Sequence, residues 1–327
     1  MKYSKILAAT LMAFGLAVTA QAADKMKIAM VVKTLGNGFF DAAHQGADEA
    51  AKELGDVEII FTGPAKATAE GQIELINSLT AQKVSAMVIS ANDADALVPA
   101  TKKAMSRGIK VLSFDSGIAK DGRVFNLLPS SNALIGEKLV KMTVDAVGNK
   151  GEVAILSATA QATNQNAWIE EVKKVLTKPE YKDLKLVSVV YGDDQTDKSY
   201  REAQGLFKSY PNLKAIIAPT TVGIAAASKA VQDGKLIGKV YVTGLGLPSE
   251  MAGHVKSGAV KSFAIWNPID LGYSITYAAH EFVKGKAGKT VSLGRVGTVT
   301  PDAEGSAPMA EPFTYDASNV EKFAKFF

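Results

Sequence analysis

The sequence contains no cysteine among its 327 residues. This absence excludes disulfides, thiolate metal sites, a cysteine nucleophile and a lipid-modified cysteine near the amino terminus. Only three histidines are present, and none has a partner at the spacing of a metal site. Walker, Gly-x-Ser-x-Gly and His-Glu-x-x-His sequences are missing too. We therefore expect no enzyme activity, no metal and no cofactor.

The chain also has little net charge and only one long apolar run. Its formal charge of +4 is too near neutral to suggest a nucleic-acid or anionic-membrane partner. The apolar run covers residues 6–18, follows Lys2 and Lys5, and leads into small residues ending at Ala22. Such a run is too short to cross a ~30 Å hydrocarbon core, and the order of charge, apolar core and small residues is that of a cleaved secretory signal. We predict a signal peptide over residues 1–22 and a periplasmic mature protein.

Short runs rich in valine and isoleucine alternate with stretches of helical periodicity along the remaining chain. This alternation is typical of a parallel sheet covered by helices on both faces. It predicts a first set of strands at residues 27–32, 57–61, 86–90, 109–114 and 124–127. Ser131 is a candidate helix cap, and after it a second set of strands is expected at residues 153–157, 186–191, 215–218, 240–243 and 262–265. Helices are expected at residues 39–54, 69–82, 95–106, 132–147, 165–176, 198–209, 222–233 and 270–283. We predict an α/β protein with two doubly wound parallel-sheet lobes and a cleft between them.

The residues that follow these strands indicate the chemistry of the cleft, because open parallel sheets bind ligands beyond the carboxyl ends of their strands. Most of them are polar or aromatic. Amides and carboxylates suit the hydroxyls of a polyol, and aromatic faces suit its C–H surface. The set comprises residues 33–40, 115–116, 162–166, 192–194, 219–221, 245–246 and 266–267. We expect a small neutral sugar as the ligand.

Two features of this set have alternative interpretations. Asp115 could accept two sugar hydroxyls or could be a turn residue before Ser116 and Gly117, and both interpretations stay open. Residues 36–41 begin like a dinucleotide fingerprint, but Asp41 stands where the third glycine belongs. A nucleotide site is therefore only weakly indicated.

The aromatic candidates divide in the same way. Trp266 follows a strand and is the better candidate for stacking on a sugar, whereas Trp168 lies within a predicted helix and has a core interpretation. Of Phe39 and Phe40, we expect one ring in the core and the other in the cleft.

Several stretches of the sequence resemble one known family, the type I periplasmic binding proteins of sugar ABC transporters. The general markers of this ribose-binding-like group are residues 36–40, 71–77, 104–115 and 266–268. Residues 157–168, 191–210 and 243–253 look like the rhamnose-transport branch, and the related autoinducer-2-binding branch shares much of this pattern. The resemblance covers essentially the whole chain after the predicted signal.

The resemblance implies two lobes joined by a three-segment hinge. Residues 23–128 and 267–293 would form the N-terminal lobe, and residues 129–266 and 294–327 the C-terminal lobe. It also implies hinge closure around the ligand, driven by the difference in ligand affinity between the closed and open forms.

The resemblance further implies which residues hold the ligand. The two related branches use a lysine after the first strand, an aspartate after the fourth strand, a polar pair at a helix start and a proline-led turn, which fall here on Lys33, Asp115, Asn164, Gln165, Pro219, Thr220 and Thr221. In the wider family the positions of Asn37, Phe40 and Trp266 line the cleft, and the strand ends add Phe39, Leu245 and Asn267. The autoinducer-2 pattern has aspartate in place of Asn164 and alanine in place of Thr221, which favours a neutral deoxysugar.

The function implied is that of a monomeric solute-binding component of an ABC sugar importer, with L-rhamnose or a similar deoxysugar as ligand. Its partners would be a permease and the ATPase subunit. A receptor for autoinducer-2 or another small furanose, read by a chemoreceptor, is the alternative within the same fold. An exported enzyme lacks support because the sequence shows no acid/base pair. A lactose-type repressor would need a helix-turn-helix where the predicted signal lies.

Overall fold

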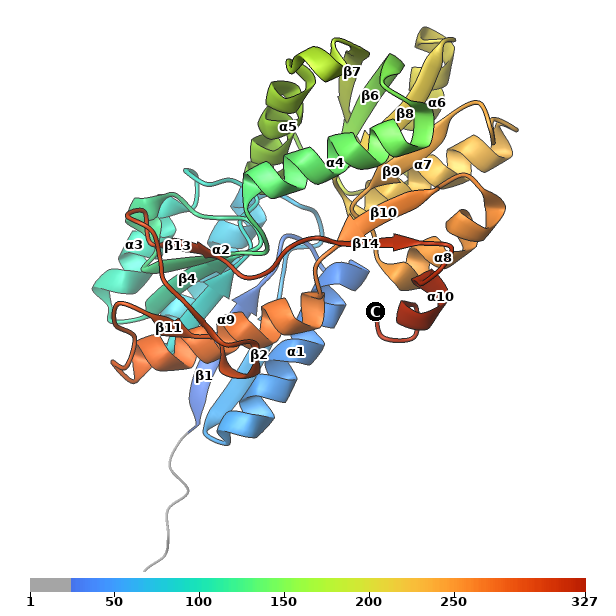
Figure 1. The fold of residues 1–327 in the computed structure, drawn as a ribbon. Coiled ribbons are helices and arrows are strands. Elements are labelled where there is room, and N and C mark those ends of the chain that lie inside the picture. Colours follow the sequence, from blue (N-terminus) through green and yellow to red (C-terminus); the bar gives the residue numbers. More distant parts are fainter. Residues whose placement is uncertain (1–24) are drawn as a thin grey trace, which may run out of the picture.

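The computed structural model describes residues 25–327, so the predicted signal peptide lies outside the described residues. Two parallel sheets with flanking helices form two lobes, one above the other in the view of Figure 1. The predicted α/β class with two parallel-sheet lobes is confirmed.

The first sheet has six parallel strands in the order β13-β5-β4-β3-β1-β2. The strands are β1 (Met26–Val31), β2 (Val57–Thr62), β3 (Ala86–Ile89), β4 (Lys110–Phe114), β5 (Phe125–Leu128) and β13 (Ser306–Pro308). The helices of this lobe are α1 (Gly38–Leu54), α2 (Ala69–Ala81), α3 (Val98–Ser106) and α9 (Pro268–Val283). Strand β3 is buried along its whole length, as continuous apolar runs are in a sheet covered on both faces.

The second sheet has four parallel strands in the order β7-β6-β8-β9. They are β6 (Lys150–Ser157), β7 (Asp183–Tyr191), β8 (Leu213–Ala218) and β9 (Tyr241–Gly244), and beside them β10 (Ser262–Ile265) pairs antiparallel with β14 (Phe313–Asp316). The helices are α4 (Asn132–Val147), α5 (Thr163–Leu176), α6 (Thr196–Ser209), α7 (Thr221–Asp233), α8 (Pro248–Ser257) and α10 (Val320–Phe323). Ser131 caps α4 as predicted, since its hydroxyl accepts the backbone N–H of Leu134 at 3.3 Å.

The chain passes between the two sheets after β5, after β10 and after β13. The boundary expected at residue 293 is wrong, because β13 pairs with β5 in the first sheet, and β11 (Val291–Ser292) and the 3-10 turn Gly294–Val296 contact α9. Residues 294–308 thus lie with the first lobe. Strand β13 is only three residues long and ends in Pro308, so the sequence carries no alternation that could reveal it.

Helices α1 and α9 cross at backbone contact, side by side in the lower lobe of Figure 1. A Cβ atom on Gly272 would lie 1.8 Å from the carbonyl oxygen of Ala43, and one on Gly46 would lie 1.8 Å from that of Ile269. Only glycine fits at this distance. The contact fastens α9, the first element after the second passage between lobes, to the first helix of the described chain.

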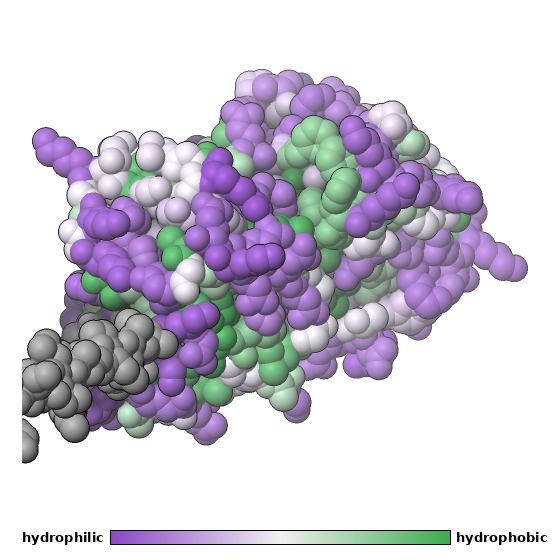
Figure 2. Space-filling model, turned by 90° about the horizontal axis from the view of Figure 1, so that it is seen from below, coloured by the Kyte–Doolittle hydropathy of each residue, from purple (hydrophilic) through white to green (hydrophobic). Residues whose placement is uncertain are grey.

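The surface is mainly hydrophilic in the view of Figure 2, with hydrophobic residues showing in smaller patches. The large apolar side chains lie mostly inside, and Tyr273, Phe114, Phe125 and Phe263 are among the largest that are fully buried. Within residues 25–327, no helix has both the length and the apolar character that crossing a membrane would require.

Candidate functional site

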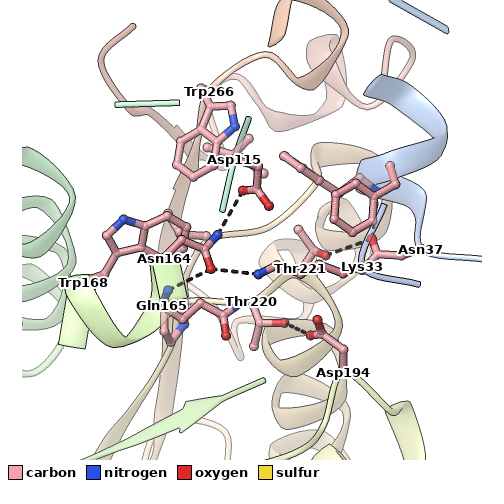
Figure 3. A pocket seen from close by; sticks show the side chains of 15 residues that line it. Lys33, Asn37, Asp115, Asn164, Gln165, Trp168, Asp194, Thr220, Thr221 and Trp266 are labelled. Atoms are coloured by element: carbon pink, nitrogen blue, oxygen red, sulfur yellow. Dashed lines mark hydrogen bonds between the residues drawn. The ribbon is translucent and has the colours of Figure 1, made fainter. Parts of the chain in front are cut away.

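A cavity lies between the two lobes, beyond the carboxyl ends of the parallel strands. It contains about 400 Å³ of space outside the protein atoms, open solvent included. Both lobes contribute to its lining, as Figure 3 shows. The lining residues are Lys33, Asn37, Phe39, Phe40, Asp115, Asn164, Gln165, Trp168, Asp194, Pro219, Thr220, Thr221, Leu245, Ile265 and Trp266.

Every binding residue expected from the sequence lines this cavity except Asn267. Asn267 is the N-cap of α9 instead, and its Oδ1 accepts the backbone N–H of Ile269 at 3.0 Å. Its Nδ2 donates to the Asp270 carboxylate at 2.8 Å. The inclusion of Asn267 is therefore corrected: an asparagine directly before a proline at the start of a helix is a cap by sequence as well.

The structure adds Trp168, Asp194 and Ile265 to the lining. The core interpretation of Trp168 is incomplete, because the side chain is buried and also faces the cavity. The sequence does indicate that Trp168 faces the cavity: it stands four residues after Asn164, so both lie on one face of α5. Asp194 was within the strand-end set but had no motif to single it out.

The two phenylalanines at the start of α1 both face the cavity and are both buried. Their rings meet edge to face at 5.3 Å. The expectation that one ring would lie in the core and only the other in the cleft is wrong, because the first turn of α1 projects into the space between the lobes. Asn37 fixes this turn, since its Oδ1 accepts the backbone N–H of Phe39 at 3.0 Å.

A chain of polar contacts joins the lobes across the cavity. The ammonium group of Lys33 donates to Asn164 Oδ1 at 2.8 Å, and Asn164 Nδ2 donates to Asp115 Oδ1 at 3.0 Å (Figure 3). Ser90 donates its hydroxyl to the other oxygen of Asp115 at 2.7 Å. Asn164 belongs to the second lobe and the other three to the first, so one amide side chain links a cation and a carboxylate of the opposite lobe.

The two aspartates of the cavity share an unusual backbone conformation. Asp115 has a φ of 58° and Asp194 a φ of 51°, a left-handed region that non-glycine residues rarely occupy and that recurs at functional sites. Burial raises the pKa of both carboxyl groups, and the nearby charge of Lys33 opposes the rise in each. Asp115 is thus both a turn residue and a cavity residue, so the two interpretations of the sequence are compatible.

The aromatic side chains form one wall of the cavity. Trp168 and Trp266 lie 5.7 Å apart between ring centroids, and Phe39 meets Trp266 edge to face at 6.2 Å. The indole N–H of Trp168 donates to Asn132 at 3.1 Å. The indole nitrogen of Trp266 is buried and has no hydrogen-bond partner among residues 25–327.

Gln72 holds the ends of β1 and β3 in place behind the cavity. The side chain is fully buried, and its Nε2 donates to the carbonyl oxygens of Val32 at 3.1 Å and Ser90 at 2.8 Å. Its Oε1 accepts the backbone N–H of Asn92 at 2.8 Å. These bonds fix the backbone next to Lys33 on one side and at Ser90, the partner of Asp115, on the other.

Replacing Gln72 by leucine is expected to lower the free energy of unfolding by about 2 kcal/mol or more, because three buried backbone groups lose their partner. Denaturant unfolding measures the loss. Gln45→Leu is the matched control, since Gln45 is exposed on α1 and exposed substitutions usually change stability by no more than ~0.5 kcal/mol. Equal stability of the two variants would contradict this role of Gln72.

Comparison with known proteins agrees with this arrangement. Residues 28–287 match the periplasmic binding protein domain. The D-allose-binding periplasmic protein of Escherichia coli is 28% identical over 283 residues, which cover 83% of this chain and 88% of that protein.

Solved structures give the same result. An ABC transporter solute-binding protein from Clostridium phytofermentas with bound L-rhamnose is 36% identical, with a TM-score of 0.88 over 93% of this chain and 99% of the other. A protein from Clostridium saccharobutylicum in complex with AI-2 has a TM-score of 0.86 over 91% of this chain and 99% of the other, and at 21% identity it shows the fold alone. The chain belongs to the periplasmic binding protein family and has its type I fold.

Proposed function

We propose that this protein is the periplasmic solute-binding component of an ABC sugar importer and that it captures a neutral monosaccharide between its lobes. The observation that carries the proposal is the contact of Asn164 with both Lys33 and Asp115 across the cavity. A ligand that replaces these contacts with its own hydroxyls would be held by both lobes at once. Closure is then favoured by the additional contacts that the ligand makes only in the closed form.

The composition of the lining favours a sugar over a nucleotide or a fully apolar ligand. Buried carboxylate, amide and ammonium groups provide acceptors and donors for hydroxyls, and the aromatic wall suits the C–H face of a ring. Both aromatic residues of the first α1 turn lie where a dinucleotide fingerprint would need open space for a pyrophosphate. We therefore retain the sugar hypothesis and set the nucleotide hypothesis aside.

Within the monosaccharides we propose L-rhamnose or a similar 6-deoxyhexose. The apolar residues of the lining, among them Leu245 and Ile265, suit a methyl group in place of a sixth hydroxyl. The relative with bound L-rhamnose, 36% identical over nearly the whole chain, points the same way. Export by the predicted signal peptide, a monomeric state and delivery to a permease with its ATPase belong to the same proposal.

An autoinducer-2 receptor is the second candidate, read by a chemoreceptor or a permease. It is favoured only by the fold shared with the AI-2 complex. The amide of Asn164 accepts from Lys33 where a carboxylate would be expected in that branch, which favours the neutral sugar.

Isothermal titration with a panel of neutral monosaccharides and autoinducer-2 tests the proposal. We expect L-rhamnose to give saturable heat with one site per chain, and the sugar to be recovered unchanged. Tight binding of another sugar together with no heat from L-rhamnose would sink the ligand assignment. Conversion of the bound sugar into a product would instead establish an enzyme.

Tryptophan fluorescence provides an independent check on the location of the ligand. Both tryptophans of the chain, Trp168 and Trp266, line the cavity, so sugar binding is expected to change the emission saturably, with the same midpoint as the heat. The Trp266→Phe variant should lose a large part of this change because it lacks one of the two indoles that line the cavity. Heat without any change in emission would show that the sugar binds elsewhere.

A further inference from the structure

The charged side chains of the cavity are not balanced. Among the described residues that line it, Lys33 is the only cation, and it faces two carboxylates, those of Asp115 and Asp194. The lining therefore carries one more negative than positive charge when both carboxylates are ionised. An uncharged ligand leaves this balance as it is, whereas an anionic ligand adds a second uncompensated negative charge in a site of low dielectric constant.

The two carboxylates differ in how far they are already engaged. Both oxygens of Asp115 accept hydrogen bonds from the protein, one from Asn164 and one from Ser90. Asp194 accepts one, from the hydroxyl of Thr220 at 2.6 Å (Figure 3), and its Oδ2 has no partner among residues 25–327. Asp194 thus provides the carboxylate oxygen with the most remaining capacity for a ligand hydroxyl.

We propose that Asp194 is a specificity-determining residue, which accepts a hydroxyl from a neutral sugar and excludes the corresponding sugar acid. The proposal rests on the monosaccharide-binding function and adds to it the charge class of the ligand. Thr220 orients the carboxylate, and the left-handed backbone after β7 directs it towards the cavity. Burial, which raises the pKa of Asp194, indicates that its charge is only partly compensated by the groups around it.

The chain offers a closely matched control in the preceding residue. Asp193 also has a left-handed backbone, with a φ of 55°. Its carboxylate pairs with Lys198 at 2.6 Å, and it does not line the cavity. Substitution by asparagine at either position removes one negative charge and keeps a residue type that tolerates this conformation, so the two variants differ in where the charge is removed.

The test uses three L-sugars that share the same ring configuration and differ only at C6. Each is titrated calorimetrically into the wild type, Asp194→Asn and Asp193→Asn. L-Rhamnose carries a methyl group at C6, L-mannose a hydroxymethyl group and L-mannuronate a carboxylate, so L-mannose controls for the added size. We expect the wild type to bind L-rhamnose and to reject L-mannuronate more strongly than L-mannose. Asp194→Asn should weaken L-rhamnose binding by roughly 10-fold or more, the loss of one charge-assisted hydrogen bond, and should raise the affinity ratio of L-mannuronate to L-rhamnose by at least roughly 10-fold. Asp193→Asn should change neither the L-rhamnose affinity nor this affinity ratio by more than about 2-fold.

A measurement on the ligand-free protein tests the role of Asp194 independently of the proposed function. Thermal unfolding of the free protein is expected at a higher temperature in Asp194→Asn than in Asp193→Asn. Asp193 is paired with Lys198, whereas the half-buried Asp194 carboxylate forms no ion pair among residues 25–327. Failure of all neutral sugars to bind the wild type would overturn the proposed function. If Asp194→Asn nevertheless unfolds at the higher temperature, the uncompensated charge of Asp194 would still be supported. Asp194 as a specificity residue is overturned if the uronate-to-rhamnose affinity ratio is the same in Asp194→Asn and the wild type, or if the two variants unfold at the same temperature.

Discussion

Replacement of Asp115 by asparagine is expected to weaken monosaccharide binding at least ~100-fold, which corresponds to about 3 kcal/mol. The carboxylate lies at the end of β4, is 5% exposed, and retains lone pairs beyond the two that bond Asn164 and Ser90. Hydrogen bonds from sugar hydroxyls to a charged acceptor are about twice as strong as those to a neutral one. Asparagine keeps the shape, removes the charge and replaces one acceptor oxygen by an NH2 donor, so titration calorimetry measures the loss of the charged acceptor.

The same substitution is expected to leave the free protein folded and at least as stable as the wild type at neutral pH. Burial raises the pKa of Asp115, so the folded state binds its proton at a higher pH than the unfolded chain does, and the ionised carboxylate destabilises the fold above that pKa. As the pH falls through the raised pKa, this destabilisation is relieved. The stability difference between variant and wild type should therefore shrink on acidification, as measured by thermal unfolding at a series of pH values.

Asp121→Asn is the control for Asp115→Asn. Asp121 is exposed on the first lobe and pairs with Lys102 at 3.0 Å, so its loss should leave sugar affinity unchanged. An affinity of Asp115→Asn within a few-fold of the wild type would mean that Asp115 shapes the turn and the polar network without holding the ligand.

Replacement of Gly272 by alanine is expected to cause the largest loss of stability, about 3 kcal/mol or more, with a fall in melting temperature of roughly 5–10 °C. The added Cβ would meet the carbonyl oxygen of Ala43 at 1.8 Å. Because that atom is backbone, α1 and α9 must move apart, and the packing between them is lost over several turns. Differential scanning calorimetry measures the effect.

Gly205→Ala is the matched control for the helix crossing. Gly205 lies in α6 and is exposed, and nothing stands within 4 Å of the Cβ that alanine would add. Here the substitution should raise stability by about 0.5–1 kcal/mol, because alanine is the better helix former. A Gly272→Ala variant as stable as Gly205→Ala would show that α1 and α9 do not depend on their backbone contact.

Most of the fold was predictable because its elements are long and periodic. The helix expected at residues 132–147 is α4 with the same bounds, and the strand expected at residues 262–265 is β10. Burial on both faces makes the strand runs continuously apolar, which distinguishes them from the helices. Residues 306–308 could not be assigned, because the three-residue edge strand there is specified by pairing with β5 and has no pattern of its own.

The candidate site was predictable in its parts but not in its contacts. Residues after parallel strands must gather at one edge of the sheet, so the positions of Lys33, Asp115 and Thr220 followed from the strand assignment. The bridge from Asn164 to Lys33 and Asp115 did not follow, because it depends on how the two lobes face each other. Asp194 was missed for the same reason: its role depends on the charges opposite, which lie in the other lobe.

A crystal structure of the complex with L-rhamnose, or with the neutral monosaccharide that binds most tightly, would show whether both lobes hold the sugar in this cavity. We expect one sugar in the cavity, with its hydroxyls within hydrogen-bond distance of Lys33 and Asp115 from the first lobe and Asp194 from the second, and with the ring against Trp266. A sugar bound outside this cavity, or one held by the residues of a single lobe, would contradict it.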